Sequence, residues 1–222
     1  MPPPAQINST LATDESVWIR SAGDYPVLCP ASQKLAYGTD GVIDSNAWTL
    51  TSASVNFATN GVAANNVVLL DRPASTFPGA GEWFAVESAA ANVLTLRRMG
   101  LDAETGQPPP TASGVQFTVY TFSPQLEEAS FELYQKFSLD DNIPNRAPTD
   151  AYDLRVLRKA CVLIVLKARY LQQARDHSGD FWGKYQEIKR ELDDTLEVIR
   201  IRWGTDGESQ PTTSIFGMRC ER

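Results

Sequence analysis

Apolar residues recur at alternating steps of three and four through residues 153–203, and no other feature constrains the fold of this chain as strongly. The first set comprises Leu154, Leu157, Cys161, Ile164, Ala168 and Leu171. The second comprises Phe181, Tyr185, Ile188, Leu192, Leu196 and Ile199. Such spacing places each set on one face of a helix. Because only a short link around His177 separates the sets, we predict a long antiparallel helical hairpin, an element that suits packing between subunits.

The predicted core of this hairpin is formed by side chains from both helices. They are Leu154, Leu157, Ile164, Leu171, Tyr185, Ile188, Leu192 and Leu196. A further helix is expected to open at Ser123-Pro124, since Ser is a common N-cap and Pro is tolerated in the first turn. These helices together predict a bundle over residues 123–203.

Between residues 48 and 122 the apolar period changes from helical spacing to alternation, which is typical of strands. The candidate strands are residues 48–52, 55–57, 67–70, 83–88, 93–97 and 115–122. Loop-like clusters rich in Gly, Asn and Pro separate them. Short strands at this spacing predict a small antiparallel barrel or sandwich over residues 39–122.

The fold class predicted from these patterns is α+β, with the β module placed before the helical bundle. Residues 1–38 form an N-terminal segment, in which residues 1–25 are expected to be a leader ordered only by contact and residues 29–38 a short helix. Trp18-Ile19 would dock this leader onto an apolar surface. Residues 204–222 are predicted to be an extended C-terminal tail.

The net charge of −7 is unevenly distributed. Residues 1–152 carry 7 basic and 16 acidic side chains, whereas residues 153–203 carry 11 basic and 8 acidic ones. The acidic part argues against general binding of nucleic acid, because phosphate contacts need a positive field. The basic helical part is open to two interpretations, a site for an acidic partner or a solvated helix face. No apolar run approaches the roughly 20 residues that cross a bilayer.

No constellation of catalytic residues emerges from the sequence. His177 is the one histidine, so a serine nucleophile would lack a second histidine as its base. The three cysteines, Cys29, Cys161 and Cys220, are far apart and are most simply free thiols of a reducing cytosol. We therefore expect no enzyme activity, no metal and no cofactor.

Several large apolar residues are candidates for contacts with other subunits. They are Trp182, Trp203, Ile215, Phe216 and Met218. Trp182 falls beside the main apolar stripe, so it belongs either to the core or to an interface, where Trp is enriched. Residues 215–218 lie within a polar tail and are either part of a disordered end or an anchor that orders on binding a partner.

Two segments together resemble the head-to-tail connector or adaptor family of tailed phages. The helical block, from residues 153–160 (DLRVLRKA) through 184–187 (KYQE) to 200–203 (RIRW), resembles the helical bundle and C-terminal arm of these neck proteins. The block of residues 48–51, 57, 61–62, 67–69, 83–86 and 94–96 is similar to small β modules inserted in phage structural proteins. A typical small adaptor is nearly all helical, so the β module is open to a role in rim decoration or in contact with capsid or tail.

The resemblance implies a structural virion protein at the neck, made in the host cytoplasm. It implies a homo-oligomeric ring of about twelve subunits beneath the portal protein, with tail or neck proteins as further partners. DNA would pass through the channel without specific binding. One alternative is a virion-associated binding module that recognises a glycan or host surface through the β module. A weaker alternative is a tail lysin, against which the missing catalytic pairings count.

Overall fold

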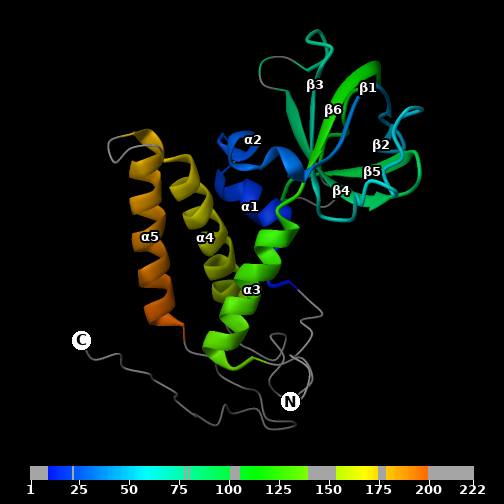
Figure 1. The fold of residues 1–222 in the computed structure, drawn as a ribbon. Helices are drawn as coiled ribbons and strands as arrows, with labels where there is room; N and C mark the ends of the chain where they lie inside the picture. The colour runs from blue at the N-terminus through cyan, green and yellow to red at the C-terminus, as the bar shows by residue number, and fades with distance from the viewer. Residues whose placement is uncertain are drawn as a thin grey trace, which may run out of the picture. The chain divides into compact units, whose positions relative to one another are not determined.

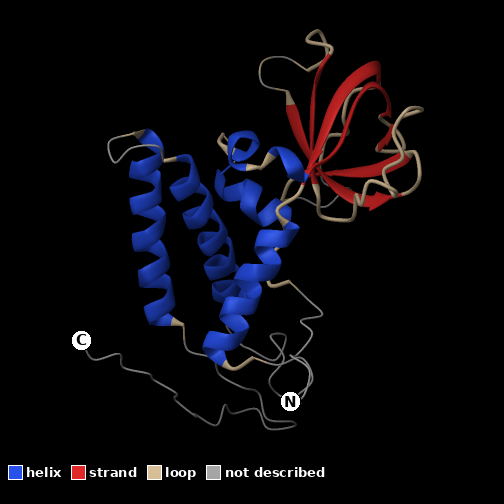
Figure 2. Ribbon diagram, in the orientation of Figure 1, coloured by secondary structure: helices blue, strands red, loops and turns tan. Residues whose placement is uncertain are grey.

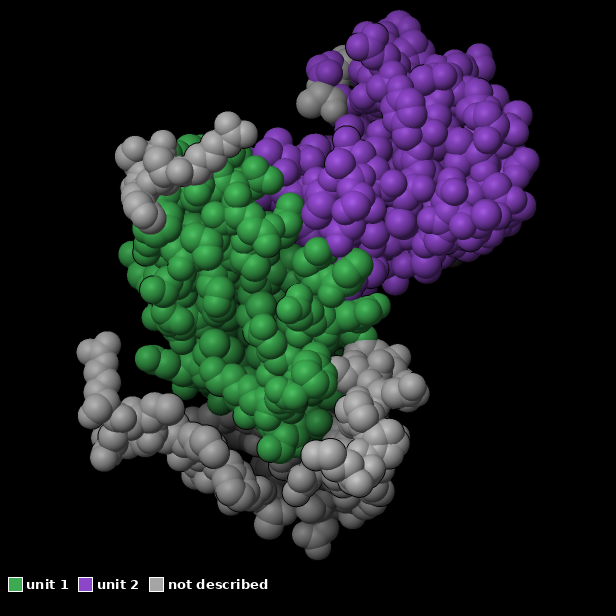
Figure 3. All heavy atoms as spheres, viewed as in Figure 1, with its two compact units in different colours: residues 1–12, 124–222 green, residues 13–123 purple. Residues whose placement is uncertain are grey.

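The computed structural model describes residues 10–21, 23–77, 79, 81–100, 106–139, 154–174 and 179–199. The chain divides into two compact units (Figure 3). One consists of residues 13–123, and the other of residues 1–12 and 124–222. The N-terminal segment that the sequence suggested as residues 1–38 is thus shared between the units. The fold class is α+β, as predicted, with five α-helices in the described part of the chain.

The β module is a closed barrel of six strands (Figures 1 and 2). The strands are β1 (Lys34–Asp44), β2 (Thr49–Thr51), β3 (Val67–Arg72), β4 (Glu82–Ala89), β5 (Val93–Arg98) and β6 (Ala112–Tyr120). Their order around the barrel is β1-β2-β5-β4-β3-β6, and every neighbouring pair is antiparallel. Closure leaves no continuous free edge, so of the two predicted architectures the chain adopts the barrel.

Alternation of side chains fills the barrel interior with apolar groups. The largest fully buried ones are Phe57, Phe77, Phe84, Phe117, Ile43, Leu50, Leu70, Leu94 and Leu96. Residues two apart on a strand share a face, so each strand sends alternate side chains into this core. A fully buried Leu or Phe stabilises the fold by about 1.5–3 kcal/mol relative to an exposed one, so this cluster is the main source of the barrel's stability.

The single helix predicted over residues 29–38 is wrong, because only Ala31–Gln33 form a short 3₁₀ helix and β1 already begins at Lys34. Several inward positions of β1 are occupied by small residues, namely Ala36, Gly38 and Gly41. Alternation of large apolar residues, the pattern that predicts a strand, is therefore absent from much of β1. The small residues are required by the neighbouring ring of Phe117. A Cβ at Gly38 would lie 2.5 Å from Phe117 Cζ, closer than packed carbon atoms approach each other.

Residues 55–57, predicted to be a strand, instead belong to the loop that follows β2. The backbone N–H of Phe57 donates a hydrogen bond to Ala91 O (2.7 Å), and its carbonyl accepts one from Val62 N (3.0 Å). The ring of Phe57 is fully buried, with its centroid 5.5 Å from that of Phe117. Residues 55–57 are thus held by the buried ring of Phe57 and not by the hydrogen bonds of a strand ladder.

The barrel unit also contains two helices at its N-terminus, α1 (Asp14–Ser21) and α2 (Tyr25–Leu28). The hydroxyl of Thr13 accepts a hydrogen bond from Ser16 N at 3.4 Å, the geometry of an N-cap. The ring of Trp18 lies 6.2 Å from that of Trp83 on β4, while Ile19 is 56% exposed. The residues expected to be a leader therefore include a helix packed on the barrel.

The second unit contains helices α3 (Ser123–Phe137), α4 (Leu154–Gln173) and α5 (Asp180–Val198) (Figure 2). Helix α3 begins at Ser123, as predicted. Helices α4 and α5 pack against each other: for example, Lys159 Nζ lies 2.7 Å from Glu191 Oε1, and the rings of Tyr170 and Phe181 lie 6.2 Å apart. Much of the link between these helices falls in residues 175–178, outside the described part of the chain.

Candidate functional site

The residues predicted to contact other subunits fall mostly outside the described part of the chain. Trp203, Ile215, Phe216 and Met218 all do so. Trp182 is described, on the first turn of α5, and is half-buried. Its ring lies 5.0 Å from that of Tyr185 at an interplanar angle of 31°. Trp182 therefore packs against a side chain of its own helix.

The residues predicted to form the hairpin core differ in burial. Leu157 is fully buried and Leu192 is 3% exposed. Five others are intermediate: Leu154, Ile164, Tyr185, Ile188 and Leu196. Leu171 is 47% exposed in the single chain, contrary to its expected place in the core.

The exposure of Leu171 follows from the rotation of the last turn of α4. Successive helical residues are turned by about 100°, so adjacent residues cannot both face α5. Tyr170 faces the ring of Phe181 and is 4% exposed, which turns Leu171 toward the surface. The predicted stripe was therefore displaced by one residue at this end of the helix.

Helix α4 has an unusual charge for a mostly buried helix. It carries five basic residues and no acidic one, and the guanidinium-bearing Arg169 is only 8% exposed. Helix α5 carries six acidic and three basic residues. The ion pair of Lys159 with Glu191 joins the two, so part of the positive charge is balanced within the chain. Lys159 is thus paired within the chain, whereas Arg155 and Arg158 are exposed on α4.

The thiol of Cys161 lies between α4 and α3. It is within 3.5 Å of Ser130 Oγ and 3.8 Å of Leu126 O. Ser130 Oγ also accepts a hydrogen bond from Leu11 N at 3.0 Å. Burial raises the pKa of Cys161 to about 11, so this cysteine remains a protonated thiol at neutral pH. A thiol in that state is a poor nucleophile, and its role is packing.

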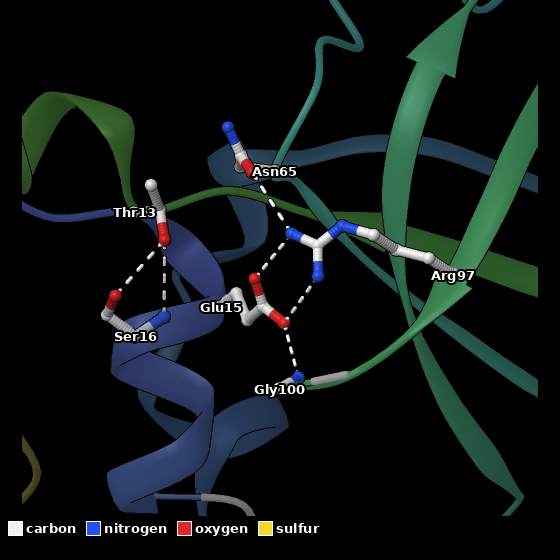
Figure 4. A network of polar contacts seen from close by, with 6 residues as sticks. All are labelled: Thr13, Glu15, Ser16, Asn65, Arg97 and Gly100. Carbon is white, nitrogen blue, oxygen red and sulfur yellow. Dashed lines mark hydrogen bonds and ion pairs between the residues drawn. The ribbon is translucent and has the colours of Figure 1, made fainter. Parts of the chain in front are cut away.

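Glu15 of α1 is held by a network of polar contacts (Figure 4). Its carboxylate accepts two hydrogen bonds from the Arg97 guanidinium, at 2.8 and 2.5 Å, and one from Gly100 N at 2.6 Å. Arg97 also donates to Asn65 Oδ1 at 3.1 Å. A two-pronged arginine–carboxylate contact fixes both position and orientation. The network therefore anchors the first turn of α1 to β5 and to the residues that precede β3.

Asp14, beside Glu15, makes a separate and more deeply buried contact. Its Oδ1 accepts a hydrogen bond from Phe122 N at 2.6 Å, and its Oδ2 accepts one from Asn66 Nδ2 at 2.8 Å. Asn66 also donates to Thr121 Oγ1 at 3.3 Å. Burial raises the pKa of Asp14 to about 6, although these hydrogen bonds oppose the rise. Adjacent carboxylates thus bind different parts of the same barrel unit.

An aromatic cluster lies next to these carboxylates in the same unit. Tyr25 of α2 is fully buried, with ring centroids of Trp83, Tyr120 and Phe122 at 5.6, 6.1 and 5.0 Å. All three contacts are edge-to-face, the arrangement that aromatic rings prefer. Burial raises the pKa of Tyr25 well above its usual value. The cluster fixes α2 on the outer surface of β4 and β6.

The described residues contain no group of three or more His, Cys, Asp or Glu side chains that could hold a metal ion. His177 lies outside the described residues. None of the helices seen in the structure is both long and apolar enough to cross a membrane. The absence of enzyme activity stays a prediction.

Sequence patterns alone do not reveal the carboxylates of α1 and their partners. They place Asp14 and Glu15 in the predicted leader, and Asn65 and Asn66 in a loop. One signal was present: Thr13 followed by two acidic residues is typical of a helix N-terminus. The partners on distant strands could not be found, because a pattern along the chain contains no information on pairs 52 to 108 residues apart.

Comparisons with protein-family models, curated proteins and solved structures found no match to this chain. The function is therefore inferred from the residues and their geometry.

Proposed function

We propose that the protein is a structural virion protein of a tailed phage, a head-to-tail adaptor that forms a ring beneath the portal. The observation that carries this proposal is the pairing of α4 and α5 within a unit separate from the barrel. In this proposal the two helices form the predicted long antiparallel hairpin of a helical bundle. Antiparallel helices pack through their apolar faces, and most homo-oligomers have closed symmetry, so such hairpins are suited to packing side by side in a ring.

The burial pattern of α5 supports a surface that is available to other subunits. Within α5, only Leu192 and Thr195 are buried in the single chain. Leu171 of α4 and Val198 of α5 are 47% and 68% exposed. Exposed large apolar side chains are common at sites of protein contact, although single ones also occur on any surface. Neighbouring copies would cover these residues in the ring.

The barrel supports a scaffolding role for the remaining unit. Its interior is filled by side chains, and its aromatic loop residue Phe77 is fully buried. A glycan-binding module would be expected to present aromatic residues from such a loop, so the binding-module alternative is less favoured. The exposed ring of Tyr37, on the outer face of β1, is the feature that such a module would use.

The net charge of −7 suits a channel through which DNA moves without being held. Trp182, Trp203, Ile215, Phe216 and Met218 are our proposed contacts to the portal or to neighbouring subunits. Deletion of residues 208–222 tests the last three. We expect the truncated protein to lose binding to portal rings in a co-sedimentation assay while its circular dichroism spectrum is unchanged.

Two further outcomes decide between the candidate functions. Undiminished sedimentation of the truncated protein with the portal would remove residues 215–218 from the interface. Binding to a glycan array that Tyr37→Ala abolishes, together with no binding to the portal, would replace the adaptor proposal with the host-recognition one.

A further inference from the structure

The two ends of the barrel unit are joined by one side chain. The chain enters this unit at Thr13 and leaves it at Ser123. Asp14 and Phe122 lie one residue inside these two points, and the hydrogen bond from Phe122 N to Asp14 Oδ1 connects them. The other oxygen of Asp14 accepts a hydrogen bond from Asn66, at the start of β3. A single carboxyl group therefore ties α1 to the exit of β6 and to the entry of β3.

This carboxyl group has an uncommon environment for a charged side chain. Asp14 is 3% exposed, and the hydrogen bonds described for it come from neutral groups. The guanidinium of Arg97 on β5 is bound by the neighbouring Glu15 and by Asn65. A buried carboxylate without a cationic partner is costly, because hydrogen bonds replace only part of its hydration.

The other ionisable groups near Asp14 add no net charge beside it at physiological pH. Tyr25 of α2 interacts with Asp14, and burial raises the pKa of Tyr25 well above its usual value. Burial also raises the pKa of Tyr120 at the end of β6. Both phenols are therefore neutral below pH 8. The Glu15–Arg97 pair adds a negative and a positive charge that offset each other.

We infer that Asp14 is a proton-responsive latch, which holds α1 and the two ends of the barrel unit together and opens more readily when its carboxyl group is ionised. The protonated form keeps Oδ1 as an acceptor for Phe122 N and avoids the cost of a buried charge, at the loss of the hydrogen bond from Asn66 Nδ2 to Oδ2. The ionised form gains hydration when α1 detaches. Opening of the latch would free the chain at both points where it enters and leaves the barrel unit.

The direction and size of the effect follow from proton linkage. Burial raises the pKa of Asp14 from 3.8 to about 6 in the closed latch, and detachment would return the pKa to its ordinary value. At a pH between these two pKa values, the closed state binds more protons than the open state. The closed state therefore becomes less stable relative to the open state as the pH rises through this range. The equilibrium constant for opening increases by about fifty-fold between pH 4 and pH 7.5.

Hydrogen exchange of the full chain tests this inference directly. The amide of Phe122 is the donor to Asp14, so its protection reports closure of the latch. After correction for the intrinsic pH dependence of exchange, we expect its protection to fall about fifty-fold from pH 4 to pH 7.5. In Asp14→Asn, a neutral side chain of the same shape, the corrected protection should not depend on pH. The Asp44→Asn variant, which removes a carboxylate on β1 that contacts Asn46, should retain the dependence on pH.

Protection of Phe122 that is independent of pH in the unmodified protein would overturn the inference, and so would an unchanged dependence in Asp14→Asn. Carbon-13 NMR of the Asp14 carboxyl group needs no variant and gives a second result. A titration midpoint near 6 is expected from its burial, whereas a midpoint near 4, typical of exposed Asp, would contradict the latch.

Discussion

The backbone N–H of Phe122 donates a 2.6 Å hydrogen bond to the carboxylate of Asp14, which lies 108 residues earlier in the chain. This contact makes the N-terminal helix α1 part of the barrel unit. Together with the Glu15–Arg97 pair it fixes the first turn of α1 to three strands or their ends. The barrel is therefore a unit of more than its six strands, and removal of residues 13–28 should destabilise it.

Gly38→Ala should destabilise the barrel by about 1–3 kcal/mol, the usual cost of inserting a methyl group into a packed core. The new Cβ would lie 2.5 Å from Phe117 Cζ, and the Phe117 ring is held by Phe57. Urea unfolding measures the change. Gly23→Ala, in the same unit, is a matched control, because a Cβ there meets nothing within 4 Å, and it should change the stability by less than about 0.5 kcal/mol. Equal changes in the two variants would contradict the packing of Gly38.

Asp40→Ala should release the loop after β2. The carboxylate of Asp40 accepts hydrogen bonds from Ala53 N and Ser54 N at 2.9 Å and from Ser52 Oγ at 2.8 Å. We expect faster amide exchange at residues 53 and 54. Asp44→Ala is the control, since Asp44 instead accepts a hydrogen bond from Asn46 N and should leave exchange at residues 53 and 54 unchanged.

The same loop should respond to acid in the unmodified protein. The hydrogen bond from Ser52, followed by those of Ser54, lowers the pKa of Asp40 to about 2, below its usual value of 3.8. The carboxylate contacts are therefore present above pH 4 and are lost as the pH falls toward 2. Exchange at Ala53 that does not accelerate over this range, after correction for its intrinsic rate, would show that Asp40 does not hold the loop.

Double-mutant cycles should distinguish the two ion pairs that differ in exposure. The side chains of Arg97 and Glu15 are 20% and 12% exposed, and we expect a coupling energy of about 1–2 kcal/mol from their paired hydrogen bonds. Those of Lys159 and Glu191 are 37% and 33% exposed, and their coupling should be about 0–1 kcal/mol. A larger coupling energy for Lys159–Glu191 than for Arg97–Glu15 would show that side-chain exposure does not determine which ion pair is stronger.

Leu192→Ala should cost about 2–4 kcal/mol of unfolding free energy in the monomer, because Leu192 is 3% exposed. Leu171→Ala should change it by less than about 0.5 kcal/mol, since Leu171 is 47% exposed. If Leu171 is covered in a ring, its replacement should weaken oligomerisation without weakening the monomer. Equal losses of monomer stability would place Leu171 in the core, as the sequence alone suggested.

Periodicity in the sequence was sufficient for large side chains and failed for small ones. Strands β2, β3, β4, β5 and β6 were predicted because residues such as Leu94, Leu96 and Phe117 alternate clearly. Strand β1 was missed because Gly38 and Gly41 occupy inward positions, where their size is set by Phe117 on another strand. The polar contacts of Asp14 and Glu15 were missed for the same physical reason: their partners are brought close only by the closed barrel.

Native mass spectrometry of the full chain, alone and mixed with portal rings of a tailed phage, tests the proposed adaptor function most directly. A ring of about twelve subunits, formed alone or only on the portal, is the result that the adaptor proposal predicts. A protein that stays a 24.4 kDa monomer at all concentrations and does not bind the portal would contradict it. The barrel unit would then become the leading candidate for the functional part of the chain, as a binding module.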